Sequence, residues 1–318
     1  MKGRAWRRPN VRDRAGHEDT QERRKIEQLA YYSFLTGFAF TVVAALVYIV
    51  VVAGSWTAYR QAATSAMSVT VPVRVAVPRS FGSFATGAAV CALGFLTTSM
   101  AARAIAVGRP PLGNLWEYTV ALGWGITLFT VAFEFAFKER AVSAVMMTVA
   151  AVMMGVALVF FPSTIKPLVP ALQSNRILGL HVTSMMLAYS ALSVSFGAAV
   201  LYLLQGPERR FQRLPAAETL EDIGYWSVLA GFPLLTLGIA LGAYWANSAW
   251  GKYWGWDPKE TSALLTWFIY AGYLHARVLR GWEGKRSAYL LIAGFAAVLF
   301  TYFAVNFLIS GLHSYAGV

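Results

Sequence analysis

Eight apolar runs dominate this sequence, and each is long enough to cross a lipid bilayer as a helix, which takes about 20 residues. They lie near residues 30–53, 82–105, 115–136, 141–161, 179–204, 224–243, 261–279 and 288–309. The connections between them are short, and only helices or closed barrels satisfy the peptide backbone in lipid. The sequence therefore predicts an all-α, polytopic membrane protein with about eight transmembrane helices, which form one domain over residues 30–318.

Composition agrees with that class and excludes nucleic acid as a partner. Charged residues make up 13% of the chain and hydrophobic residues 57%, against roughly 25% and about 45–50% in soluble domains. The formal charge is +12, but the basic residues are spread over short loops and the N-terminal tail and line no single face. Residues 1–29 combine nine basic and five acidic side chains with little apolar mass, so we expect a disordered tail.

The loop charges predict the orientation in the membrane. If residues 245–261 lie outside, the loops on the inner side carry twelve basic residues, and the outer loops, residues 245–261 included, carry six. Basic loops stay preferentially in the cytoplasm, so this pattern places residues 245–261 on the extracytoplasmic face. The N-terminal tail disagrees, because it would lie on the same outer face with nine basic residues, and its side stays open.

One loop is unusually aromatic. The stretch WANSAWGKYWGWDPKET, residues 245–261, holds four of the eleven tryptophans. Indole rings offer flat stacking surface, and Gly251 and Gly255 allow a backbone to approach a flat ligand closely. Two interpretations remain: tryptophans that anchor the helices at the membrane interface, or a platform for a planar ligand such as haem or a quinone.

Two histidines share the end of the bundle on which this loop lies. His181 opens the fifth apolar run and His313 follows the eighth, so an even number of crossings separates each from the loop. Two imidazoles could bind haem iron from above and below. His275 lies about 20 Å further along its helix than Glu260, at about 1.5 Å per residue, so it belongs toward the other side of the membrane.

The motifs in this half of the chain resemble those of one family. The loop is similar to the WGxxWxWD (WWD) signature of the CcsA/ResC family of cytochrome c maturation proteins, which handle haem in membranes. Three further segments also resemble that family: PPLGNLWEYT at 110–119, LVPALQSN at 168–175 ahead of His181, and GLHSY at 311–315. The likeness runs from about residue 82 to the end, and it departs at Ser262, where many relatives have tryptophan.

The resemblance implies haem b as the substrate and a role for each matching residue. His181 and His313 would be the axial iron ligands on the outer face. His275 would meet haem within the membrane, paired with a histidine of a CcsB/ResB-like partner protein. The remaining matches would hold the porphyrin and the loop: Trp250, Gly251, Trp254, Trp256 and Asp257. For Asp257, simple capping of the following helix is the alternative, and for Glu117 we expect a structural contact at that face.

The implied function is system II cytochrome c maturation in a bacterial inner membrane. The chain would present haem for covalent attachment to the CxxCH motif of apocytochrome c, as a subunit of a cytochrome c synthase complex. It has a single cysteine, Cys91, so proteins of a thiol-reducing pathway would have to keep the apocytochrome reduced. The alternatives are a haem exporter of the CcmC type and a b-type electron-transfer cytochrome.

Overall fold

The computed structural model describes residues 11–65, 79–165, 167–168, 176–206, 211, 214–304, 309 and 311. Within these residues the chain forms eight α-helices and one π-helical turn and contains no strand, which confirms the all-α class. The elements are α1 (Val11–Ser65), α2 (Arg79–Val107), α3 (Leu115–Phe137), α4 (Ala141–Phe160), α5 (Arg176–Gln205), α6 (Ala217–Trp250), α7 (Pro258–Arg280), α8 (Lys285–Leu299) and η2 (Phe300–Ala304).

Seven of the eight described helices are long and apolar enough to cross a membrane, so the chain is a multi-pass membrane protein. The eighth, α7, does not meet that criterion. Its first turn carries Glu260, and its last turn carries Arg277 and Arg280. Of these, only Arg277 lies within the stretch that the sequence predicted to span at 261–279, where His275 and several threonine, tryptophan and tyrosine residues also lower the hydropathy.

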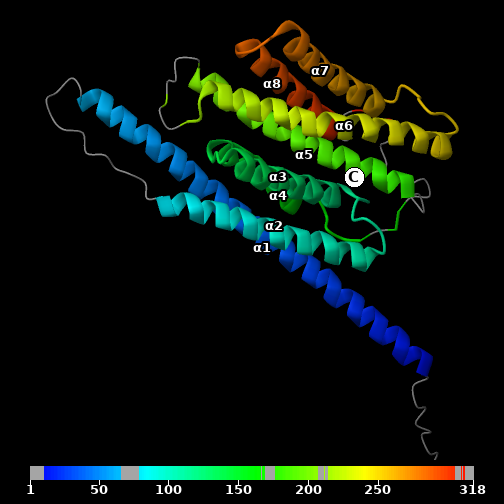
Figure 1. Cartoon of the computed structure of the whole chain (residues 1–318). Helices are drawn as coiled ribbons and strands as arrows, with labels where there is room; N and C mark the ends of the chain where they lie inside the picture. Colours follow the sequence, from blue (N-terminus) through cyan, green and yellow to red (C-terminus); the bar gives the residue numbers. More distant parts are fainter. Residues whose placement is uncertain are drawn as a thin grey trace, which may run out of the picture.

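The helices pack as antiparallel pairs, α1 with α2, α3 with α4, α5 with α6 and α7 with α8 (Figure 1). Contacts of α3 and α4 with α5 join the first four helices to the last four. Because consecutive helices alternate in direction, the start of α3, the start of α5, the end of α6 and the start of α7 meet at one end of the bundle. We call this the cavity end and the opposite one the far end.

Glycines bring α5 and α6 into close contact. Three glycines of α6 face α5: Gly231, Gly238 and Gly242. A Cβ atom on Gly238 would lie 2.5 Å from the sulfur of Met185, and one on Gly242 would lie 2.6 Å from Cε1 of His181. Small residues let membrane helices approach this closely. The same glycines therefore fix where the His181 ring sits.

A buried carboxylate ties the first four helices together at the far end. Glu134 of α3 accepts hydrogen bonds from the hydroxyl groups of Tyr48 (2.5 Å), Thr86 (2.5 Å) and Ser143 (2.6 Å), which belong to α1, α2 and α4. The Arg140 Nε atom lies 3.4 Å from Glu134 Oε1 and supplies the opposite charge. The Glu134 carboxylate is thus stabilised on both oxygens.

Two helices extend further than the hydropathy pattern indicated. Helix α1 begins at Val11, so residues 11–29 of the predicted tail are already helical. Helix α6 continues to Trp250, which places Trp245 and Trp250 on its last turns. The connection between α6 and α7 therefore comprises only residues 251–257.

Candidate functional site

A cavity opens at the cavity end of the bundle, among α3, α5, α6, α7 and η2. Its interior volume is about 130 Å³, and its walls are mostly apolar. Pockets for small molecules and cofactors usually measure about 300–1,000 Å³. A ligand of that size would therefore have to widen the cavity or extend through its opening.

One wall of the cavity is a single face of α5. His181, Met185 and Tyr189 all line it, and their spacing of four residues puts them one above the other on the helix. From His181 to Tyr189 the wall extends about 12 Å, at about 1.5 Å per residue. The imidazole therefore lies at the end of a long apolar wall.

The imidazole of His181 is held in one orientation. Its Nδ1 atom lies 2.6 Å from the backbone carbonyl oxygen of Gly238. A carbonyl oxygen only accepts hydrogen bonds, so Nδ1 carries the proton, and the lone pair of the neutral ring is on Nε2. Histidines that bind metals are commonly oriented by such a hydrogen bond from the other nitrogen.

Tryptophans form a second wall. Trp245, which is only 2% exposed, and Trp254 both line the cavity. Trp250 packs edge-on against Trp245, with 4.8 Å between the ring centroids, and Trp256 packs edge-on against Trp254 at 5.9 Å. The four tryptophans of the loop motif thus form two T-shaped pairs, each with one ring on the cavity.

The backbone of the loop is constrained at both ends. Gly251 ends α6 in the left-handed region with φ 73°, and its N–H donates to the carbonyl of Asn247. Trp256 also has a positive φ of 55° and is 69% exposed. A left-handed conformation costs a residue with a side chain about 1–2 kcal/mol. This strained, exposed tryptophan is a functional candidate, since such strain is concentrated at functional sites.

A capping box starts α7 directly after the tryptophans. The Asp257 side chain accepts from the N–H of Lys259 at 3.0 Å, and the Glu260 carboxylate reaches back to the N–H groups of Gly255 and Asp257 at 2.8 and 3.1 Å. Asp257 is buried and is not among the described residues that line the cavity. The structure therefore gives Asp257 the capping role that the sequence offered as the alternative.

Gly311 lies against this cap. A Cβ atom on Gly311 would lie 2.5 Å from Oδ1 of Asp257 and 3.1 Å from Cδ of Pro258. Gly311 opens the GLHSY motif, and the start of that motif therefore lies against the start of α7. His313, the second predicted axial ligand, lies outside the described residues.

A lysine joins the polar part of the cavity wall. Lys259 stands in the first turn of α7, before the predicted span, and lines the cavity together with Glu260. Burial lowers the pKa of the Lys259 ammonium group from 10.5 to about 8, against the opposing charge of Asp257. A positive charge at this position therefore lies in a poorly solvated environment.

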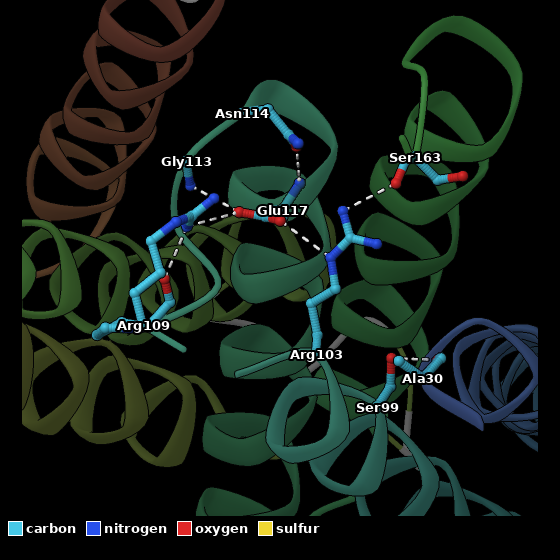
Figure 2. A network of polar contacts seen from close by, with 9 residues as sticks. Ala30, Ser99, Arg103, Arg109, Gly113, Asn114, Glu117 and Ser163 are labelled. Carbon is cyan, nitrogen blue, oxygen red and sulfur yellow. Dashed lines mark hydrogen bonds and ion pairs between the residues drawn. The ribbon is translucent and has the colours of Figure 1, made fainter. Parts of the chain in front are cut away.

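A buried ion-pair cluster supports the α3 side of the cavity (Figure 2). The Glu117 carboxylate, 1% exposed, accepts from Arg103 Nε at 2.9 Å, Arg109 at 3.1 Å and the N–H of Gly113 at 2.7 Å. Asn114 caps α3 by accepting from the N–H of Glu117. Gly113 lines the cavity, so the cluster holds the wall in place, as expected for a structural glutamate. With two arginines and one glutamate it carries one net positive charge.

Hydroxyl groups line the cavity beside η2. The hydroxyl groups of Tyr302 and Thr119 lie 2.6 Å apart. The Tyr189 hydroxyl group is buried and has no hydrogen-bond partner among the described residues. A buried unpaired hydroxyl group costs free energy, and a ligand that accepts a hydrogen bond would recover it.

His275 is not part of this cavity. It lies exposed on α7, four turns beyond Lys259, on the face that carries the exposed Leu265 and Phe268. Within the described residues, no group of three or more His, Cys, Asp and Glu side chains could hold a metal ion alone. A metal that enters the cavity near His181 would need ligands of its own, as the iron of a porphyrin has.

Sequence comparison places the chain among known proteins. Residues 112–313 match the family model described as cytochrome C assembly protein. Relatives described as cytochrome c biogenesis protein CcsA include those of Guillardia theta (37% identical, covering 72% of this chain and 84% of the relative) and Prochlorococcus marinus strain NATL2A (40%, covering 70% and 81%). This chain belongs to the CcsA family. It therefore acts in cytochrome c biogenesis, and the resemblance carried by its motifs is confirmed.

A solved structure shares the fold. The CcsA-family chain superposes on the structure described as cytochrome c heme lyase CcmF with a TM-score of 0.64 and 18% identity. The match covers 95% of this chain and 48% of that protein, so the chain spans about half of its length. At this identity the likeness describes the architecture only.

Of the residues predicted for the site, His181 and Trp254 line the cavity directly, and Trp250 and Trp256 lie behind or beside its tryptophan wall. Sequence reasoning counted Trp245 among the four tryptophans of the loop but gave it no role of its own, and it missed other lining residues, among them Tyr118, Tyr189 and Lys259. The four-residue spacing of His181, Met185 and Tyr189, opposite Gly238 and Gly242, was the signal that could have revealed the α5 wall.

Proposed function

We propose that this CcsA-family protein binds haem as a substrate in the cavity and presents it for covalent attachment to apocytochrome c. The observation that carries the proposal is the His181 imidazole, oriented by Gly238 and placed at the end of a long apolar wall in a cavity that tryptophans also line. A porphyrin is flat, largely apolar and brings four nitrogen ligands to its iron. It then needs only axial ligands from the protein.

His313 is the proposed second axial ligand. It follows Gly311 by two residues, and Gly311 lies against Asp257 at the start of α7. Trp250, Gly251, Trp254 and Trp256 would support the porphyrin from the loop. Two axial histidines would hold the iron six-coordinate until a third ligand arrives.

Attachment is a simple addition. Each thiol of the CxxCH motif adds across one vinyl group of haem: a sulfur–carbon bond forms at the carbon next to the ring, and the thiol hydrogen goes to the terminal carbon. The step consumes neither oxidant nor reductant. Positioning of the two reactants supplies the rate enhancement. The histidine of the CxxCH motif then replaces one axial ligand and releases the product.

Two further kinds of protein are required by this scheme. The thiols must arrive reduced, and the chain's one cysteine, Cys91, lies on α2, away from the cavity, so thiol-reducing proteins must act first. His275 lies on an exposed face of α7, which suits a CcsB/ResB-like membrane partner that supplies a second histidine to haem within the membrane.

We further propose that the cavity end faces the extracytoplasmic side of a bacterial inner membrane. The loops at the far end carry twelve basic residues, twice as many as the connecting loops at the cavity end with the tryptophan loop included, and cytoplasmic loops are enriched in such residues. Attachment on that side would meet apocytochromes after their export.

The test is maturation of a CxxCH reporter by the full chain with its partner, scored as haem that stays on the reporter after denaturation. His181→Ala should abolish covalent attachment, and added imidazole should restore part of it by filling the vacant ligand position. His17→Ala is the matched control and should leave attachment unchanged. Full attachment by His181→Ala without imidazole would contradict the ligand assignment.

The same experiment separates the alternatives. A haem exporter would deliver haem to a soluble acceptor without a thioether bond, so haem would leave the reporter on denaturation. A b-type cytochrome would retain its haem and leave the reporter unmodified. Only the proposed function predicts haem that remains covalently bound to the reporter.

A further inference from the structure

We propose that Lys259 forms an ion pair with a propionate carboxylate of the bound haem and thereby fixes the rotation of the porphyrin in the cavity. The inference rests on the proposed function, since it concerns the same cavity. It assigns to Lys259 a part in choosing which edge of the ring faces the incoming thiols. It is a positioning role that touches the substrate but not the reacting atoms.

Lys259 is the basic residue among the described residues that line the cavity, and Glu260 is the acidic one. The Glu260 carboxylate is already engaged, because its Oε2 atom accepts from the N–H groups of both Gly255 and Asp257. That bonding fixes Glu260 against the loop backbone. A carboxylate that enters the cavity therefore meets Lys259 as its complementary charge.

Two features near Lys259 add positive charge, against the negative charge of the buried Asp257 carboxylate. Its own helix begins at this point, and the start of a helix carries partial positive charge. Gly113, which also lines the cavity, lies so close to the Arg109 guanidinium group that a Cβ atom would have no room. The cluster of Arg103, Arg109 and Glu117 behind Gly113 carries one net positive charge.

The consequence concerns orientation. Axial ligands hold the iron but leave the porphyrin free to rotate about the bonds to it. The two propionates of haem lie at one edge of the porphyrin, and the two vinyl groups are on the other two pyrrole rings. One ion pair to the propionate edge therefore stops this rotation. The half of the ring that carries the vinyl groups is then turned away from Lys259.

The test compares two porphyrins that differ only in charge. The full chain, purified with its partner, is titrated with ferric protoporphyrin IX and with its dimethyl ester, in which both carboxylates are blocked. Lys259→Gln should lower the affinity for the free acid by about tenfold to a hundredfold, the range for a charged hydrogen bond, and change the affinity for the ester by less than about twofold. Lys252→Gln, in the exposed part of the same loop, is the matched control and should change neither.

Two further readouts keep the test decisive. Lys259→Arg retains the charge and should keep most of the preference for the free acid, even if Lys259→Gln folds poorly. In the unmodified protein, the free acid should bind more tightly than the ester by the factor that Lys259→Gln removes. Equal losses for both porphyrins, or no loss for either, would overturn the role of Lys259 while leaving haem binding intact. If the unmodified protein bound neither porphyrin, the proposed function itself would fail.

Discussion

Both ends of the bundle place polar groups among apolar helices, but these groups are paired to different extents. At the far end, the Glu134 carboxylate is stabilised by hydroxyl groups from α1, α2 and α4 and by Arg140. At the cavity end, the Tyr189 hydroxyl group has no partner among the described residues, and Lys259 lies in a poorly solvated wall.

The difference separates a structural cluster from a binding site. A buried polar group without a partner costs about 1–3 kcal/mol, so a fold retains such groups only where something else compensates. The polar groups of the Glu134 cluster pair with one another and join four helices. At the cavity end, the cost of burying the Tyr189 hydroxyl group is not offset by any described residue. A bound ligand could offset it.

The largest effect is expected at the far end. Glu134→Ala removes the common acceptor of three hydroxyl groups and the partner of Arg140, so the variant should lose about 3 kcal/mol of stability, as when one partner of a buried ion pair is removed. Thermal unfolding of the purified protein in detergent measures the loss. Glu283→Ala, which removes an exposed carboxylate, should stay within about 0.5 kcal/mol.

That pair of variants also tests the division between the two ends. Folded Glu134→Ala protein should bind haem with nearly unchanged affinity, because Glu134 does not line the cavity. A loss of haem affinity as large as that of His181→Ala would mean that the two ends are coupled, and the contrast between them would fail.

The second prediction changes the cavity without touching a charge. Gly242→Ala would put a Cβ atom 2.6 Å from Cε1 of His181, so the imidazole must leave its position next to Gly238. We expect haem affinity to fall by about tenfold or more, which corresponds to about 1.4 kcal/mol, and the absorption spectrum to lose its six-coordinate form. Stability should change little, because alanine is the better helix former.

The control for this variant is another helical glycine. Gly94→Ala adds the same methyl group on α2, where nothing lies within 4 Å of the new atom. It should leave both haem affinity and the spectrum unchanged. Normal six-coordinate binding by Gly242→Ala would show that the position of His181 is not important for the iron.

The sequence predicted the helices and their directions better than the residues at which they end. Hydropathy located all eight α-helices of the described residues, and the alternation of their directions put His181 at the same end as the tryptophans. It could not foresee that α6 continues through Trp245 and Trp250, because helix ends depend on local packing as much as on composition.

The polar clusters were hidden for a different reason. Glu134 meets Tyr48 across 86 residues of sequence, and Thr119 meets Tyr302 across 183. Such pairs leave no local pattern, whereas helix periodicity and capping signals are local. The capping of α7 by Asp257 could be expected from the Asp-Pro that starts it. The presence of Lys259 and Tyr189 in the wall of one cavity could not.

The smallest effects come from removing one oxygen atom at each end. Tyr48→Phe deletes a hydroxyl group that donates to Glu134 and should lower stability by about 1–2 kcal/mol, as for a hydrogen bond to a charged group. Tyr189→Phe deletes a hydroxyl group that has no partner among the described residues, so the protein without haem should be as stable as the unmodified protein or slightly more so. Unfolding of both variants with and without haem gives the comparison.

If haem accepts a hydrogen bond from Tyr189, the ligand should stabilise Tyr189→Phe less than it stabilises Tyr48→Phe. An equal loss of stability in the two haem-free variants would show that the Tyr189 hydroxyl group is paired within the protein and that the cavity end is as self-sufficient as the far end.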